Sequence, residues 1–295
     1  MSHTAYASRS LRRRSPRSRS GTLKISRLIV YLILIAGSAV MLFPFLWLLR
    51  SSFMSTAQIF TFPPEWIPNP FLWSNYTEAL TIVPFELYFL NTLTIEVIVV
   101  TGVLLTSAMA GYSFARLRWP GRNVAFGLLL STLMLPYAVT LIPTFMVWKQ
   151  LGAINTFVPL TVPAWFGGGA FNIFLLRQFF LTIPKDLDEA AYMDGARPFG
   201  VFVRIVLPLS MPALIVVGIF TFIGVWNDFL GPLIYLSDDS KFTLAIGLAS
   251  FNGLYNAQWG YLMAASTAIV APIIVLFFVA QRYFIEGITL TGIKG

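Results

Sequence analysis

Long runs of apolar residues, separated by shorter polar segments, dominate the pattern of this chain. The clearest run covers residues 28–49 and contains no charged residue. A helix that crosses the hydrocarbon core of a bilayer needs about 20 mainly apolar residues, and five further segments meet this requirement. The six predicted spans are residues 28–49, 91–115, 123–148, 157–176, 209–236 and 260–280. The pattern therefore predicts an all-α, polytopic membrane protein whose six-helix transmembrane domain covers residues 28–283.

The composition supports this prediction and excludes several kinds of chemistry. Hydrophobic residues make up 57% of the 295 residues and charged residues 11%, against about 25% charged residues in soluble domains. The chain has no cysteine, and its one histidine, His3, lies near the N-terminus. These counts exclude disulfides and a cysteine nucleophile, and they argue against histidine-based catalysis and metal binding. We therefore predict no catalytic residue, no metal site and no cofactor bound by this chain.

The net charge of +8 is concentrated at the N-terminus, where residues 1–27 hold eight of the twenty basic residues. This segment could be an arm for nucleic acid or anionic lipid, or a disordered cytoplasmic tail that sets the topology. The distribution of the other basic residues favours the tail. With the N-terminus inside, 17 basic residues fall on the cytoplasmic side and three fall outside, namely Arg50, Lys149 and Lys241. Because cytoplasmic loops are enriched in Lys and Arg, we expect both termini to be cytoplasmic, with lipid and not nucleic acid as a partner.

The predicted cytoplasmic loop at residues 182–208 has an unusual composition. It contains four of the twelve acidic residues of the chain, all between Asp186 and Asp194. Helix-forming residues predict a short helix that ends at Gly195, because glycine commonly follows a helix C-terminus. A second short helix is expected from Pro198 to Pro208. On the first helix, Leu187, Ala190 and Ala191 are spaced as a packing face, and the opposite face is acidic, so the loop is predicted to dock a cytoplasmic partner.

The spacing within this loop is similar to the EAA signature of ABC-importer permeases. Here the signature is Glu189-Ala190-Ala191, then Gly195, Ile205 and Leu207-Pro208. The stretches "NTLTIEVIVVTGVLLTSAMAGYSFARLRWPGR", "GVWNDFLGPLIYL" and "QRYFIEGITLTGIKG" also resemble the carbohydrate-uptake branch of this family, typified by the smaller permease of the maltose importer. The resemblance covers roughly residues 28–295 and leaves out the Arg-rich tail. The chain contains no G-x-x-x-x-G-K-[ST] nucleotide-binding loop.

The resemblance implies a type I ABC-importer architecture in a prokaryotic inner membrane. Its partners would be a second homologous permease, two cytoplasmic ATPase subunits that use ATP-Mg, and an external solute-binding protein. The EAA loop would then dock on an ATPase through Leu187, Glu189, Ala190, Ala191, Gly195, Ile205, Leu207 and Pro208. The outer loop would touch the binding protein at Gly253, Leu254, Tyr255 and Asn256. Residues 284–295 are expected to form a cytoplasmic tail that either reaches the ATPase interface or simply frays.

Two acidic residues inside predicted spans are candidates for the solute pathway, because ionisable groups within a membrane are costly and often functional. These are Glu96 and Asp228, and the neighbouring Trp226 and Asn227 would suit a sugar. The alternative for all four residues is packing against other helices. An ion-coupled secondary transporter is the alternative function, although only these two carboxylates could serve it. The identity of the solute cannot be read from the sequence.

Overall fold

The structure is a computed structural model that describes residues 20–252 and 258–292, with side chains described for 27–252 and 258–281. It forms two units, residues 1–49 and 50–295, which are considered separately. The first unit consists of most of α1 (Ser20–Ser51), a 32-residue helix. This helix is apolar on every side from residue 28 to 49, the pattern of a helix surrounded by lipid or by other membrane helices. It matches the first predicted span.

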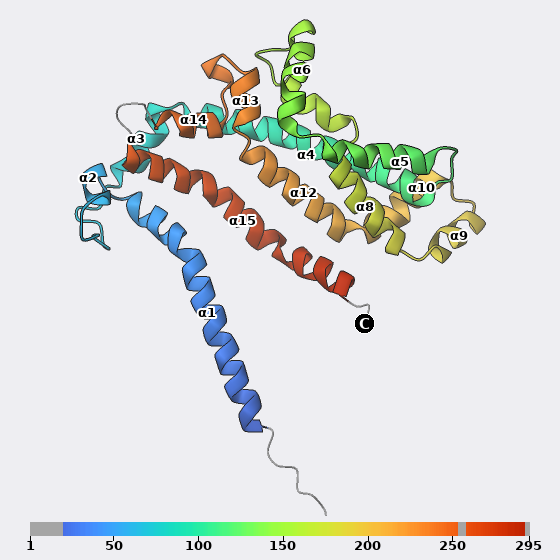
Figure 1. The fold of residues 1–295 in the computed structure, drawn as a ribbon, viewed down its shortest axis with the longest axis horizontal. Helices are drawn as coiled ribbons and strands as arrows, with labels where there is room; N and C mark the ends of the chain where they lie inside the picture. Colours follow the sequence, from blue (N-terminus) through green and yellow to red (C-terminus); the bar gives the residue numbers. More distant parts are fainter. Residues whose placement is uncertain (1–19, 253–257, 293–295) are drawn as a thin grey trace, which may run out of the picture. The chain divides into compact units, whose positions relative to one another are not determined.

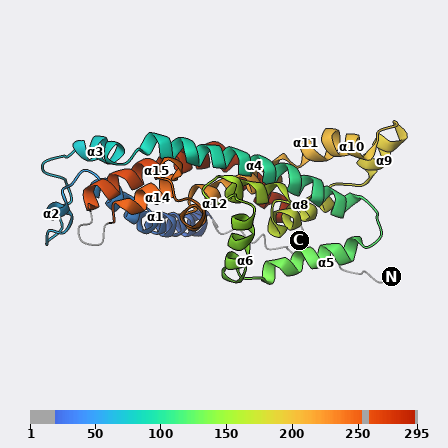
Figure 2. The ribbon, with the colours of Figure 1, turned by 90° about the horizontal axis from the view of Figure 1, so that it is seen from above.

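The second unit is built around the long helix α4 (Phe85–Arg116), which packs along α8 (Ala170–Thr182) and α12 (Met211–Trp226) (Figures 1 and 2). Small residues allow α4 and its neighbours to come close, as is common between membrane helices. A Cβ atom on Gly102 would lie 2.7 Å from the indole of Trp165, and one on Gly168 would lie 2.8 Å from the carbonyl oxygen of Val103. An apolar core lies between α4, α8 and α12 and includes buried residues of the segment before α12.

The described residues contain four helices long and apolar enough to cross a membrane, and up to six spans if each of two bent helix pairs counts as one. The single spans are α1, α4, α15 (Trp259–Gly292) and the segment formed by α7 (Val158–Thr161), η2 (Val162–Trp165) and α8, which is interrupted at residues 166–169. The first bent pair joins α5 (Arg122–Ser131) and η1 (Thr132–Met134) to α6 (Tyr137–Gln150) at 101°. The fold class predicted from the sequence is thus confirmed for the described residues.

The second bent pair differs from the predicted fifth span at residues 209–236. It joins α10 (Pro198–Val201), η3 (Phe202–Val206) and α11 (Leu207–Leu209) to α12 at 77°. The helix then stops at Trp226 and restarts as α13 (Leu230–Tyr235). The break follows from Asp228, whose carboxylate accepts a hydrogen bond from the Gly231 N–H at 3.1 Å and so competes with the helical pattern of the backbone.

The segment between α1 and α4 is ordered by side-chain hydrogen bonds to the backbone. Its helices are α2 (Thr56–Ile59), which begins with a capping box at Ser55, and α3 (Ser74–Ile82). The amide of Asn75 donates to the carbonyl oxygens of Ser52 and Met54, both at 2.9 Å. Further along the chain, η4 (Asp239–Lys241) and α14 (Leu244–Ser250) form the other large connection. α3, α14 and α15 surround a second apolar core.

The C-terminal part of α15 differs from the predicted tail at residues 284–295. The backbone stays helical as far as Gly292, about three turns beyond the expected end of the sixth span at residue 280. A single helix therefore continues through most of the segment that the sequence suggested would be a separate tail.

Candidate functional site

The candidate coupling loop begins with α9 (Asp186–Met193), a helix of eight residues. Asp186, Asp188 and Glu189 lie in its first turn, where the N–H groups of the helix terminus favour negative charge. The short acidic helix that the sequence predicted before Gly195 is therefore present.

Gly195 ends α9 in the geometry of a Schellman motif. Its φ is +81°, and its N–H donates to the Tyr192 carbonyl oxygen at 3.0 Å. The Ala196 N–H reaches back to the Ala191 carbonyl oxygen at 2.9 Å. Both bonds satisfy carbonyl groups at the helix end, and the left-handed backbone at this position favours glycine. The joint that the sequence predicted at Gly195 therefore has a clear backbone cause.

The two faces of α9 differ from the sequence prediction. Leu187 is 42% exposed, and Glu189 and Ala190 are also exposed, whereas Ala191 is half-buried against the core of α4, α8 and α12. Asp188 was expected on a water-facing acidic side, but it is buried, with 7% of its surface exposed. That expectation was wrong because an arginine from another helix meets Asp188 inside the protein.

This arginine is Arg116, the last residue of α4. Its Nη1 atom lies 3.2 Å from Oδ2 of Asp188, and both side chains are more than nine-tenths buried. Its Nη2 atom donates to the carbonyl oxygens of Phe180 at 2.8 Å and Ile183 at 2.6 Å. One guanidinium group therefore joins α4, the end of α8 and the coupling loop.

The second half of the loop is held by packing. Val201, Phe202 and Val206 are buried, and Ile205 and Leu207 pack half-buried against the same core, while Pro208 is exposed. Within the signature, Glu189 and Ala190 are thus exposed. Ile205 and Leu207 instead hold the loop against its own membrane helices.

The four candidate solute residues have separate environments. Trp226 is 2% exposed, stacks on Phe222 with ring centroids 5.3 Å apart, and donates from Nε1 to the Ile269 carbonyl oxygen at 3.1 Å. Asn227 is exposed and its amide donates to the Ile223 carbonyl oxygen at 2.8 Å. In this conformation Trp226 serves helix packing, the alternative that the sequence left open, and Asn227 faces outward.

Asp228 and Glu96 are the two acidic candidates. Asp228 borders a small cavity of about 40 Å³ together with Thr92 and Thr243. Glu96 is 2% exposed, and neither of its carboxylate oxygens has a hydrogen-bond partner among the described residues. The cavity is close in size to one or two water molecules and too small for a sugar ring. The structure therefore does not bring the four candidates together into one solute site.

The predicted binding-protein contacts Gly253, Leu254, Tyr255 and Asn256 lie outside the described residues. Both ends of this loop are held in place, because the Gln258 N–H donates to the Phe251 carbonyl oxygen at 3.1 Å and Phe251 is buried. No group of three or more His, Cys, Asp or Glu side chains able to hold a metal occurs in the part of the chain that was described.

Comparison with known proteins agrees with this geometry. Residues 102–289 match the family described as the binding-protein-dependent transport system inner membrane component. The chain belongs to this family. It is therefore a multi-pass permease of the inner membrane, the non-catalytic component of an importer that depends on a binding protein, and the EAA signature found in the loop is that of its family.

Individual relatives of the permease cover most of its length. It is 36% identical over 272 residues to the probable ABC transporter permease protein YurM of Bacillus subtilis, covering 91% of this chain and 87% of the relative. It is 34% identical over 256 residues to the diacetylchitobiose uptake system permease protein NgcG of Streptomyces coelicolor, covering 86% and 84%. A crystal structure of a bacterial ABC transporter involved in alginate import matches with a TM-score of 0.77 at 24% identity, over 92% of this chain and all of the other, which supports the fold.

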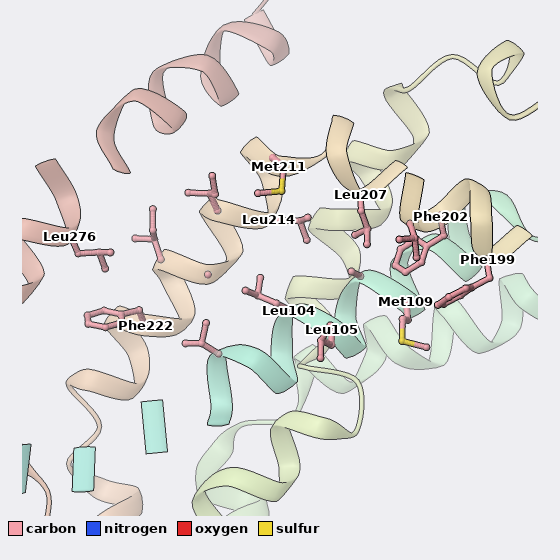
Figure 3. Close-up of a pocket in the computed structure, with 16 residues that line it drawn as sticks. Leu104, Leu105, Met109, Phe199, Phe202, Leu207, Met211, Leu214, Phe222 and Leu276 are labelled. Carbon is pink, nitrogen blue, oxygen red and sulfur yellow. The ribbon is translucent and has the colours of Figure 1, made fainter. Parts of the chain in front are cut away.

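The described part of the permease also contains an apolar groove of about 600 Å³. Figure 3 shows side chains of α4, such as Leu104, and of α12, such as Leu214, that project into it, with Leu276 of α15 at one end. Its lining side chains include no hydrogen-bond donor, and the sulfur atoms of Met109 and Met211 are only weak acceptors. A sugar needs hydrogen bonds to its hydroxyl groups, so this groove does not fit a sugar.

Sequence reasoning missed Arg116 as a functional candidate and counted it only as a basic residue that sets topology. The available signal was weak: an arginine at the cytoplasmic end of one span and a surplus of acids in a loop predicted on the same side. Nothing in the sequence indicated which of the acids in α9 would face this arginine.

Proposed function

We propose that this permease carries a carbohydrate through an ATP-driven importer and couples to the ATPase through the outward face of α9. The observation that carries the proposal is the division of α9 into two faces. Asp188 and Ala191 attach the helix to the protein, while Leu187, Glu189 and Ala190 remain exposed. A short helix that is anchored on one side and open on the other is suited to insertion into a cleft of another subunit.

The composition of the exposed face supports an ATPase as the partner. Ala190 permits close approach of another backbone, Leu187 offers an apolar contact, and Glu189 offers a charged one. In the proposed complex a second, homologous permease completes the pathway, and two ATPase subunits hydrolyse ATP-Mg. The excess of basic residues on one side supports an orientation with both termini in the cytoplasm.

Two observations support a carbohydrate as the solute. The relative NgcG is named as part of a diacetylchitobiose uptake system. The sequence around residues 225–236 also resembles the carbohydrate-uptake branch. We infer that the binding protein selects the particular sugar and delivers it to the outer loops, including residues 253–256, whose flanking segments are fixed as described above.

The test is uptake by cells from which this permease has been deleted. A panel of radiolabelled diacetylchitobiose, maltose, an arabinose oligosaccharide and sn-glycerol 3-phosphate is compared with and without a plasmid copy of the permease. We expect that uptake of at least one sugar is lost and then restored by the plasmid, and that it stops when ATP is depleted. Unchanged uptake of every sugar would contradict a carbohydrate solute. Uptake that continues on a proton gradient without ATP would favour the secondary transporter.

A further inference from the structure

We propose that Arg116 and Tyr112 of α4 are positioning residues that fasten the coupling loop to this membrane helix, so that a displacement of α9 moves α4 with it. This inference deepens the proposed function and rests on the docking of α9 to an ATPase. It concerns the step after docking, namely how movement of the loop reaches the membrane-spanning part. The two residues are four positions apart, so they lie on the same face of the last turns of α4.

The first attachment is the buried ion pair of Arg116 with Asp188 at 3.2 Å. Opposite charges attract more strongly where the effective dielectric constant is low, and separating them here would leave a charge without compensation inside the protein. The same guanidinium binds the carbonyl oxygens of Phe180 and Ile183, just before the loop begins. α9 therefore cannot move along α4 unless Arg116 loses its contact with Asp188 or its hydrogen bonds to the Phe180 and Ile183 carbonyl oxygens.

The second attachment lies beyond the Gly195 joint. The hydroxyl of Tyr112 donates to the Pro198 carbonyl oxygen at 3.0 Å, at the start of α10. The ring of Tyr112 packs on Phe202 with centroids 4.9 Å apart, and Tyr112 is 4% exposed. The helices on both sides of the joint are thus tied to the same end of α4, near which Figure 1 shows α9 and α10.

The two attachments hold the loop to α4 on both sides of the Gly195 joint. Gly195 is exposed and no other atom lies within 4 Å of its position for a Cβ, so the joint itself does not pack against α4. Because each helix of the loop has its own contact with α4, the loop and the cytoplasmic end of α4 behave as one body. Loss of either contact would let α9 move while α4 stays behind.

The first experiment measures ATP hydrolysed per solute transported, in the complete importer reconstituted in proteoliposomes with its ATPase and binding protein. The variants are Arg116→Ala, Asp188→Ala, the double variant and Tyr112→Phe. We expect the ratio to rise at least threefold in both alanine variants, to be no higher in the double variant than in either single one, and to rise less in Tyr112→Phe. Two exposed residues outside the coupling loop provide matched controls, Arg118→Ala and Glu86→Ala, for which no change is expected.

The second experiment distinguishes a loss of the attachment between α9 and α4 from a general loss of stability of the permease. Because the chain has no cysteine, spin labels can be placed at Asp186→Cys on α9 and at Val97→Cys on an exposed position of α4. We expect one narrow distance between the labels, the same with and without ATP and vanadate, and a broad distribution when Arg116→Ala is added. An unchanged distance in that variant, or a normal ratio of ATP to solute, would overturn the proposal.

The outcomes also distinguish this proposal from the proposed function. If the ATPase does not copurify with the unmodified permease, or if Glu189→Lys leaves its binding intact, the docking of α9 is wrong. If docking is normal and only the transmission measurements fail, the attachment by Arg116 and Tyr112 is wrong while the proposed docking stands.

Discussion

The backbone of Gly195 offers a sharp test of the coupling loop, because its conformation can be altered without creating a clash. A residue other than glycine in the left-handed region costs about 1–2 kcal/mol, and Gly195 has a φ of +81°. No atom lies within 4 Å of the position that a Cβ would occupy. The cost of Gly195→Ala is therefore conformational, and it corresponds to a factor of about 5–30 in the population of the ordered helix end.

The cost of each substitution at this position should depend on how well the new residue adopts the left-handed backbone conformation, and not on the size of its side chain. Gly195→Asn should cost less than Gly195→Ala, because asparagine tolerates the left-handed region better. Gly195→Pro should cost most. Its ring fixes φ near −65°, and it removes the N–H that donates to the Tyr192 carbonyl oxygen at 3.0 Å, a bond worth about 0.5–1.5 kcal/mol.

The assay is solute uptake and binding-protein-stimulated ATP hydrolysis in the reconstituted importer, with the amount of inserted permease measured by immunoblot. We expect every variant to insert normally. The coupling of ATP hydrolysis to uptake should be strongest with the original Gly195 and should weaken progressively in Gly195→Asn, Gly195→Ala and Gly195→Pro. Gly200→Ala is the matched control, because Gly200 also has free space for a Cβ and lies within α10 without a positive φ. Normal uptake by Gly195→Pro would refute the reasoning, and so would equal losses in the Asn, Ala and Pro variants.

Four further predictions follow from individual contacts. Glu189→Lys should insert normally but separate ATP hydrolysis from uptake, and retained coupling would show that Glu189 does not contact the ATPase. Trp226→Phe should lower the free energy of unfolding by about 0.5–1.5 kcal/mol, because the indole hydrogen bond is lost, and thermal denaturation would measure this. The solute concentration for half-maximal uptake should stay unchanged in a transport assay. A change in that concentration would favour solute contact by Trp226. Gly168→Ala should reduce the amount of folded permease on size-exclusion chromatography, because its Cβ would lie 2.8 Å from the Val103 carbonyl oxygen. Deletion of residues 1–20 should leave uptake intact at equal membrane levels, and a loss of uptake would assign a function to that tail.

The helical type of the membrane segments could be predicted because it depends on local properties. An apolar run of about 20 residues is driven into lipid as a helix whatever its neighbours are. The joint at Gly195 was also predictable, since it depends on the backbone freedom of one residue. The ends of the helices were less predictable: the fifth span breaks at Asn227, where the Asp228 carboxylate accepts a hydrogen bond from the Gly231 N–H, and α15 continues to Gly292.

By itself, the sequence determined the helical membrane fold, the place of the coupling loop and its signature, because transfer to lipid, helix capping and residue spacing act over a few turns. The tertiary structure decided which residues of the loop face inward. Asp188 is buried because folding brings Arg116 to it from the far end of another span. Trp226 is committed to packing because Phe89 of α4 and the Ile269 backbone of α15 meet its ring. Such pairings depend on how separate helices come together, and no local pattern along the chain records them.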